Sequence, residues 1–245
     1  LYEDEALIAL DKPAGLAVHG GSGISLGVIE TLRRARPTAK YLELVHRLDR
    51  ETSGILLVAK KRSALVHLQN QFKQRETGKT YLAMVLGQWP VNKKVLDKPL
   101  HKYLLPDGER RVKVVAKDDP DGMPSLTLVR VRGAGGLVPA TPQQPAGGER
   151  GYSLLEVTIK TGRTHQIRVH LASEGLPIVG DDKYGDIESN KGLARTNSAT
   201  PLKRMFLHAW RLQYNHPATG QRMELLADLP VELAQFARQV LPQSI

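Results

Sequence analysis

A charged segment stands directly before an apolar one near residue 50, and this junction limits how the chain can fold. Residues 46–54 read HRLDRETSG and carry five charged or ionisable side chains with a single leucine among them. The run that follows, ILLVA at 55–59, is typical of a strand buried on both faces. Because an unpaired charge is costly to bring near a core, we expect a tight turn that holds Asp49 at the mouth of a core strand.

The remaining apolar patterns predict an α+β fold. Strands are predicted at 6–15, 54–60, 79–87, 125–132 and 152–160, and as a hairpin at 206–217 and 221–228. Helices are predicted over 25–37, after Ser63 as N-cap, over 162–177 with Thr164 as N-cap and Gly175 just past the end, and over 231–241. The polar segments 133–151 and 186–204 are predicted as loops. Strands outnumber helices without regular alternation, which favours a large, mostly antiparallel sheet.

Length and composition are those of an ordinary soluble protein. The chain has 245 residues, of which 41% are hydrophobic and 24% charged, and no apolar run approaches the ~20 residues of a membrane helix. It contains no cysteine, which excludes disulfides, thiolate zinc sites and cysteine nucleophiles and is compatible with a reducing cytoplasm. We therefore expect a cytoplasmic protein with no membrane segment.

The charge of the chain favours a polyanionic partner. The formal net charge is +10 and the pI about 9.8, a surplus most often found in proteins that bind nucleic acid. A basic protein without such a partner remains an alternative at this point. Aromatic residues make up only 5% of the chain, so extensive base stacking of the single-strand-binding type is not indicated.

Several kinds of active site are excluded or disfavoured by the motifs. Leu48 interrupts the His-Arg-Asp pattern of protein kinases, and no glycine-rich phosphate loop of the Walker type occurs. Asp49 and Glu51 are too close in sequence to be the usual carboxylate pair of a glycosidase. His165 and His170 are five residues apart, which suits neither one helix face nor one strand face, so we expect no metal site.

Asp49 is the carboxylate that remains, and two interpretations of it stay open. It can be a turn aspartate, held by hydroxyls or backbone amides of the residues that follow. Alternatively, Arg163 or Arg168 in GRTHQIR keeps a functional Asp49 ionised and lowers its pKa by charge pairing. Tyr81 in KTYLAMV is either a core tyrosine or a flat platform for a planar ligand.

Four motifs in order carry a resemblance to a known family. DKPAG, HRLDRETSG, KTY and GRTHQIRVHL resemble the motifs of the RluA-type pseudouridine synthases, and the resemblance runs from about Asp4 to Leu229. It implies a large mixed, mostly antiparallel sheet with flanking helices and a central cleft. It also implies a single catalytic domain over residues 1–245, without the N-terminal S4-type RNA-binding domain that such enzymes usually carry.

The activity implied by the resemblance is isomerisation of uridine to pseudouridine in large-subunit (23S) ribosomal RNA. Such enzymes flip the base out of its stack and use no cofactor and no metal. We therefore expect RNA as the partner, no membrane, and a monomer. The sequence does not name the target uridines. Three alternatives stay open: a synthase acting on tRNA, a non-catalytic RNA-binding module in ribosome assembly, and a hydrolase that releases uracil.

Residue roles follow from matching motif positions. Asp49 is implied to be the essential carboxylate, with attack at C1′, addition at C6 and removal of the C2′ proton all left open. Arg168 is implied to pair with Asp49, and Tyr81 to stack on the target base and help to remove the C5 proton. The substrate-binding residues implied are Arg47, which fills the gap left by the flipped base, Ile167, which lines the pocket, and His46, Arg163 and His165.

Overall fold

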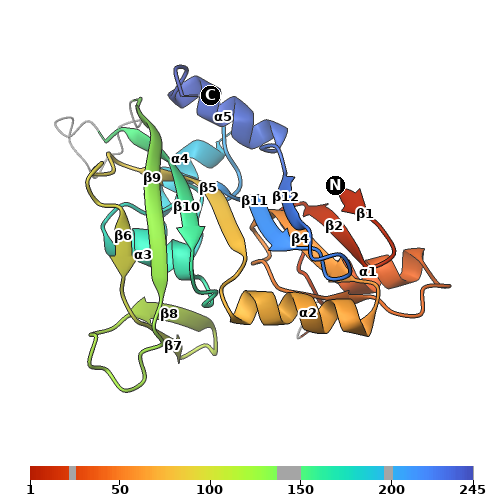
Figure 1. Ribbon diagram of the computed structural model, residues 1–245. Helices are drawn as coiled ribbons and strands as arrows, with labels where there is room; N and C mark the ends of the chain where they lie inside the picture. The colour runs from red at the N-terminus through yellow and green to blue at the C-terminus, as the bar shows by residue number, and fades with distance from the viewer. Residues whose placement is uncertain (22–25, 137–149, 196–200, 245) are drawn as a thin grey trace. The chain divides into compact units, whose positions relative to one another are not determined.

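The computed structural model describes residues 1–21, 26–136, 150–195 and 201–244 (Figure 1). The chain divides into two compact units. The first comprises Leu1–Thr80 and His208–Leu229, and the second Tyr81–Leu207 and Pro230–Ile245. Among the described residues, no helix is long and apolar enough to cross a membrane.

The first unit contains a mixed sheet. Its strands are β1 (Tyr2–Glu3), β2 (Leu7–Lys12), β3 (Glu43–Leu44), β4 (Ser53–Ala59), β11 (Leu207–Asn215, in this unit from His208 on) and β12 (Arg222–Leu226). The order is β1-β2-β4-β11, with β12 on β11 and β3 on β4. These pairs are antiparallel except β4 and β11, which run parallel with His208 opposite Ser53. The predicted buried strand at 54–60 is therefore confirmed as the central β4.

Helices cover both faces of this sheet, which explains why β4 has no polar alternation. Every residue of β4 is buried. Ile55 and Leu57 share a core cluster with Leu68 of α2 (Arg62–Lys73), whereas Val58 lies in a second cluster with Ile29 of α1 (Val28–Ala35). Figure 1 shows α2 running alongside these strands. The apolar side chains at helical spacing therefore determine which face each helix covers.

The second unit combines a sheet with a separate hairpin. The strand order is β5-β10-β9-β6, and β7 and β8 form a separate two-stranded sheet. β9 is antiparallel to both β10 and β6, and β7 is antiparallel to β8. The strands are β5 (Gly78–Leu86, in this unit from Tyr81 on), β6 (Val95–Asp97), β7 (Leu100–Leu104), β8 (Arg110–Val114), β9 (Leu126–Gly135) and β10 (Tyr152–Ile159).

The described part of the second unit also contains the helices α3 (Gln166–Ser173), α4 (Ile187–Ala194) and α5 (Val231–Val240). Val169 of α3 packs with Leu100 and Val112, so the helix rests on the β7–β8 hairpin. Phe236 of α5 meets the Tyr152 ring edge-on, with the ring centroids 5.5 Å apart. The helix α3, which carries Ile167 and Arg168, is thus held by apolar packing along its buried side.

The α+β prediction is confirmed, but several local predictions are wrong. Neither predicted N-cap is observed, because α2 is capped at Lys61 and α3 at His165 in a left-handed conformation (φ 52°). Three short strands between 95 and 114 were not predicted, because charged residues interrupt their apolar pattern. The polar segment 186–204 contains α4, whose N-cap is Asp186. Most of the predicted loop 133–151 lies outside the described residues.

Candidate active site

Asp49 begins a tight turn that leads into β4. The Thr52 N–H donates to the Asp49 carbonyl at 3.0 Å, which closes a four-residue turn through Arg50 and Glu51. Leu48 is buried and Arg50 exposed. Asp49 itself is partly buried and makes at least one further interaction within the protein. The predicted position of Asp49 at the entrance of a core strand is therefore confirmed.

The buried side chain of Lys12 holds the backbone of this turn in place. Lys12 is 1% exposed, and its ammonium donates to the carbonyls of Pro13 and Leu16 at 2.8 Å and of Arg50 at 3.0 Å. The Gly15 N–H also donates to the Arg50 carbonyl, while Arg50 Nε donates to the Gly15 carbonyl. The DKPAG segment is therefore bonded to the residue that follows Asp49, and three carbonyl oxygens stabilise the buried ammonium.

The end of the turn is fixed by β11. The Ser53 hydroxyl and His208 Nδ1 are 2.8 Å apart, and His208 Nε2 lies 2.8 Å from the Ala227 carbonyl. Because Nε2 must donate to that carbonyl, Nδ1 accepts from Ser53. Ser53 is fully buried, so this pair is structural rather than a nucleophile and base. Gly54 has φ 113°, and a Cβ there would lie 2.3 Å from the Ala209 carbonyl, so only glycine fits.

His46 is a neutral structural histidine beside the turn. Its Nε2 accepts from the Leu57 N–H at 3.0 Å, and its ring stacks on Phe72 with centroids 4.9 Å apart. Burial, together with the charge of Lys79, lowers the pKa of His46 to about 3, although a hydrogen bond to the backbone of Arg47 acts in the opposite direction. Since His46 contacts the backbone of both Leu57 and Arg47, it connects the turn to β4.

Acid is expected to destabilise the protein through His46. Its pKa is about 3 when folded and about 6.5 when unfolded, so its contribution is fully present above pH 6.5 and is lost as the pH falls below it. Between pH 7.5 and 5 this loss is about 2 kcal/mol of the free energy of unfolding. Urea unfolding at pH 7.5 and at pH 5 measures this loss. The fall in the free energy of unfolding between the two pH values should be smaller in His46→Gln than in the wild type, by about 2 kcal/mol. An equal drop in both proteins would contradict this assignment.

Arg168 is held by the carboxylate of Asp181 within the second unit. Its Nε donates to Asp181 Oδ2 at 2.8 Å and its Nη2 to Asp181 Oδ1 at 2.7 Å. Both side chains are buried, at 4% and 1% exposure. Burial raises the pKa of Asp181, but hydrogen bonds from Arg168 and from the backbone of Lys183 and Tyr184 outweigh it and lower the pKa overall. The guanidinium therefore has a fixed orientation.

Tyr184 connects Arg168 to its surroundings. The Arg168 guanidinium lies 5.2 Å from the centre of the Tyr184 ring, and that of Arg111 lies 5.6 Å from it. The Tyr184 hydroxyl is 2.7 Å from His165 Nδ1 and accepts from the Val112 N–H. A cation–π contact orients a guanidinium, so Tyr184 and Asp181 fix Arg168 from two directions.

The predicted site residues fall into two groups. His46, Arg47 and Asp49 lie at or just before one turn of the first unit, whereas Tyr81 and the GRTHQIR residues lie in the second. Tyr81 and Ile167 are buried, and Arg163 Nε donates to the Pro124 carbonyl at 3.1 Å. Contact between Asp49 and Arg168 stays a prediction.

Three supporting residues were not predicted: Lys12, Asp181 and Tyr184. Lys12 carries a signal in the sequence, because it ends an apolar strand and stands directly before Pro-Ala-Gly. The segment GDDKYG, which contains the other two, places two acids between glycines directly after an apolar run. Within the described part of the chain, no cluster of three or more His, Asp or Glu side chains could hold a metal ion.

The chain belongs to the RNA pseudouridylate synthase family, whose model matches residues 6–173. The resemblance to RluA-type synthases drawn from the motifs is thereby confirmed.

Curated relatives and solved structures agree with this assignment. A Salmonella typhi protein named ribosomal large subunit pseudouridine synthase C is 48% identical over 236 residues, 95% of this chain and 67% of the relative. The Escherichia coli K12 protein of that name is 47% identical over 94% of this chain and 66% of its own length, so the chain spans about two thirds of such relatives. Human RNA pseudouridylate synthase domain containing 4 superposes with a TM-score of 0.74 at 26% identity, covering 98% of this chain and 92% of that one. Human RNA pseudouridylate synthase domain containing 1 superposes with a TM-score of 0.71 at 25% identity, covering 94% of this chain and 82% of that one.

Proposed function

We propose that this protein converts specific uridines of large-subunit ribosomal RNA to pseudouridine. The observation that carries the proposal is the turn at Asp49, a carboxylate whose flanking backbone is fixed by Lys12 and by the Ser53–His208 pair. A catalytic group needs this kind of fixed position. The substrate class is taken from relatives 47% and 48% identical to this chain that carry the name ribosomal large subunit pseudouridine synthase C.

The reaction is an isomerisation in which no atom is added to the RNA. The bond between N1 and C1′ breaks, the uracil turns, and C5 bonds to C1′; C5 loses its proton and N1 gains one, so the atoms balance. Asp49 is the group that we assign to this chemistry, either at C1′, at C6 or at the C2′ proton. A carboxylate must be ionised to act as nucleophile or base.

Arg168 is the cation that we assign to Asp49. Arginine has five N–H donors, so a guanidinium bound by Asp181 through Nε and Nη2 can also serve a second carboxylate. In this assignment Asp181 fixes the guanidinium on one side, and the guanidinium keeps the Asp49 carboxylate ionised and in place on the other, next to the reacting base. Both units therefore belong to one catalytic domain in this assignment, because each unit contributes residues to the site.

The remaining residues are assigned to base flipping. A base must leave its stack before its glycosidic bond can react, which costs roughly a few kcal/mol. We assign Arg47 to the vacated position, since a planar guanidinium can stack there and also contact phosphates. Tyr81 holds the flipped uracil by its face, Ile167 lines the pocket, and His46, Arg163 and His165 lie around the bound nucleotide.

The direct test uses purified protein with transcripts of 23S ribosomal RNA and of tRNA. Carbodiimide modification followed by primer extension should reveal new pseudouridines in the ribosomal transcript. Modification of tRNA alone would overturn the assigned substrate, and RNA binding without modification would favour the ribosome-assembly alternative. Release of free uracil would indicate a hydrolase.

Replacing Arg47 with alanine is expected to slow single-turnover pseudouridine formation on folded RNA about tenfold or more, because a stacking contact is worth ~1–3 kcal/mol. Arg47 is exposed, with no side-chain partner among the described residues, so the melting temperature should not change. Arg47→Lys keeps the charge without the planar group and should retain most of the defect. A wild-type rate for Arg47→Ala would contradict the assigned role.

The cellular setting belongs to the same proposal. An enzyme of ribosomal RNA acts in the cytoplasm of a bacterium, where that RNA is made, and the absence of cysteine from the chain is compatible with this. We also propose that the protein acts as a monomer, which light scattering of the purified protein would test.

A further inference from the structure

The end of α2 has an arginine where local geometry favours glycine. Arg75 follows the last helical turn and has φ 61°, one of two non-glycine residues with positive φ among those described. Its N–H donates to the Phe72 carbonyl, and the Glu76 N–H donates to the Gln71 carbonyl at 2.9 Å. These two bonds define the Schellman termination, whose left-handed position is usually glycine because a Cβ is disfavoured there. Arg75 therefore occupies this position at a local conformational cost.

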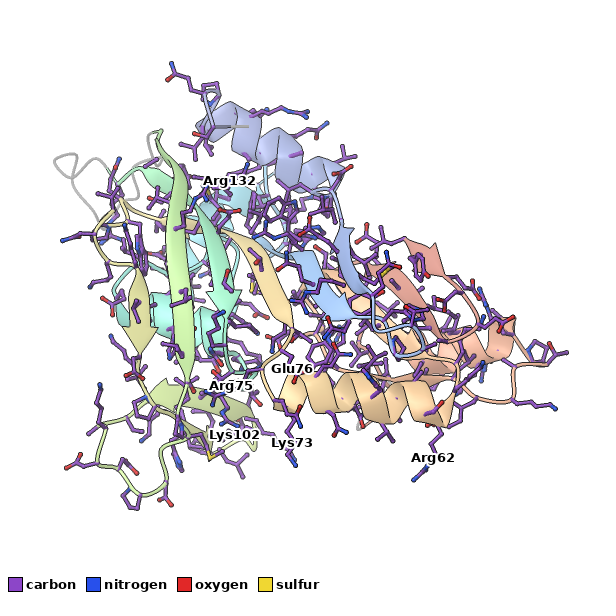
Figure 2. The ribbon with its side chains drawn as sticks, in the orientation of Figure 1. Arg62, Lys73, Arg75, Glu76, Lys102 and Arg132 are labelled. Atoms are coloured by element: carbon purple, nitrogen blue, oxygen red, sulfur yellow. The ribbon has the colours of Figure 1, made fainter. Side chains whose placement is uncertain are left out.

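Contacts within the folded protein do not account for this arginine. Arg75 is exposed, and within the described residues its guanidinium has no hydrogen bond or ion pair. The same holds for the ammonium of Lys73, two residues earlier. Figure 2 shows Lys73, Arg75 and Glu76 gathered at this end of α2, with Arg62 at the other. Lys73 already supplies the cation that a helix C-terminus favours, so Arg75 is not needed for that purpose.

Further cations border the same end of the helix. Arg222 Nη1 donates to the Glu76 carbonyl at 3.0 Å, and Lys79 Nζ lies 5.4 Å from the centre of the Phe72 ring. The nearby acids are Glu76 and Glu224, and Glu224 accepts from Gln213. Four cations against two acids leave an excess of positive charge. We call the four cations, Lys73, Arg75, Lys79 and Arg222, the α2-terminal patch.

We propose that Arg75 contacts a backbone phosphate of the substrate RNA, outside the flipped nucleotide, with Lys73 beside it. The inference rests on the proposed function for the identity of the RNA. Arg75 is six residues before Tyr81, which limits their separation to about 20 Å of extended chain. One RNA molecule that presents a uridine to Tyr81 is therefore long enough to contact Arg75 as well. A planar guanidinium fits a phosphate, and a fixed backbone lowers the ordering cost of that contact.

Three substitutions of Arg75 separate the charge from the backbone strain. Arg75→Gly removes both, Arg75→Ala removes only the charge, and Arg75→Lys retains both. Filter binding to a 23S ribosomal RNA transcript, over a range of NaCl concentrations, should give a Kd about three to ten times higher for Gly and Ala. The slope of log Kd against log salt should also fall by about 1 for these two variants, whereas Lys keeps the wild-type slope.

Stability should change in the opposite direction from affinity. Arg75→Gly is expected to raise the melting temperature by about 2–4 °C, since glycine adopts the left-handed conformation without strain. Arg75→Ala is not expected to raise it, because alanine keeps the Cβ. A variant that is more stable yet binds RNA less tightly cannot owe its defect to misfolding. Arg62→Ala, at the far end of α2 by about 20 Å, removes an equal charge and should change Kd less than twofold.

Two results would overturn the proposal: wild-type affinity and salt slope in Arg75→Gly, or an equal loss of affinity in Arg62→Ala, which would indicate a general charge effect. The outcome is separate from that of the proposed function. If the wild-type protein forms no pseudouridine while Arg75→Gly weakens RNA binding, the function fails and the contact remains. If the wild-type protein modifies RNA and Arg75→Gly binds normally, the contact alone fails.

Discussion

Replacing Asp49 with asparagine is expected to abolish pseudouridine formation, with a loss of about a thousandfold or more in the single-turnover rate. The amide has the same shape but can act neither as a nucleophile nor as a base at neutral pH. The turn itself should persist, because its closing bond uses the backbone carbonyl of Asp49, and Lys12, Gly15 and Ser53 add contacts that do not involve the Asp49 side chain. Tritium release from RNA labelled at uracil C5 measures the rate directly.

The matched control for this variant is Asp228→Asn. Asp228 is an exposed aspartate of the same unit, so the substitution makes the same change in charge at a side chain to which no part of the reaction is assigned. It should release tritium at the wild-type rate, and both variants should retain wild-type melting temperature and RNA affinity. Full activity in Asp49→Asn would remove the basis for assigning the chemistry to this carboxylate.

Replacing Asp181 with asparagine is expected to lower the free energy of unfolding by about 3–5 kcal/mol, because it leaves the buried Arg168 guanidinium without its bidentate anion. In the protein that remains folded, Arg168 is no longer fixed, so the rate of tritium release at saturating RNA should fall more than the RNA affinity. A residue that only stabilised the fold would leave the rate per folded molecule unchanged. Urea unfolding and single-turnover assays at low temperature measure the two effects separately.

Asp182 provides a control one residue away. Its side chain is 72% exposed and lies 3.4 Å from Arg168 Nη2, so Asp182→Asn removes an exposed ion pair worth about 0–1 kcal/mol. Asp181→Glu, which keeps the charge, should recover part of the lost rate. Equal losses of stability in Asp181→Asn and Asp182→Asn would contradict the assigned role of the buried pair.

The sequence predicts the apolar framework well, for a physical reason. The continuous run in β4 indicates burial on both faces, and the structure has α1 on one face and α2 on the other. The strands β7 and β8 were missed because their charged side chains interrupt the apolar pattern, although Leu100 and Val112 anchor the hairpin to α3. The N-cap of α3 was misplaced because His165 adopts a left-handed conformation that residue type alone does not indicate.

The site was predictable where a motif carried it and not where distant polar groups meet. HRLDRETSG indicates Asp49, whose catalytic role stays a prediction, but it does not indicate the residues that fix its turn, which include Lys12 and His208, far away in sequence. Arg50, next to Asp49, contacts the Gly15 carbonyl and lies 3.6 Å from Glu51, as expected if a more distant cation serves Asp49. Asp181 escaped prediction because hydrophobic periodicity reports burial, not the partner of a buried arginine.

The most direct test of the central claim, that Asp49 carries out uridine isomerisation in ribosomal RNA, is a pseudouridine map of large-subunit ribosomal RNA at single-nucleotide resolution. The map is made from cells that lack the protein and from the same cells supplied with the wild-type protein or with Asp49→Asn. The account predicts that particular pseudouridines disappear with the protein, return with the wild type and stay absent with Asp49→Asn. An unchanged map in cells that lack the protein, or full restoration by Asp49→Asn, would contradict it.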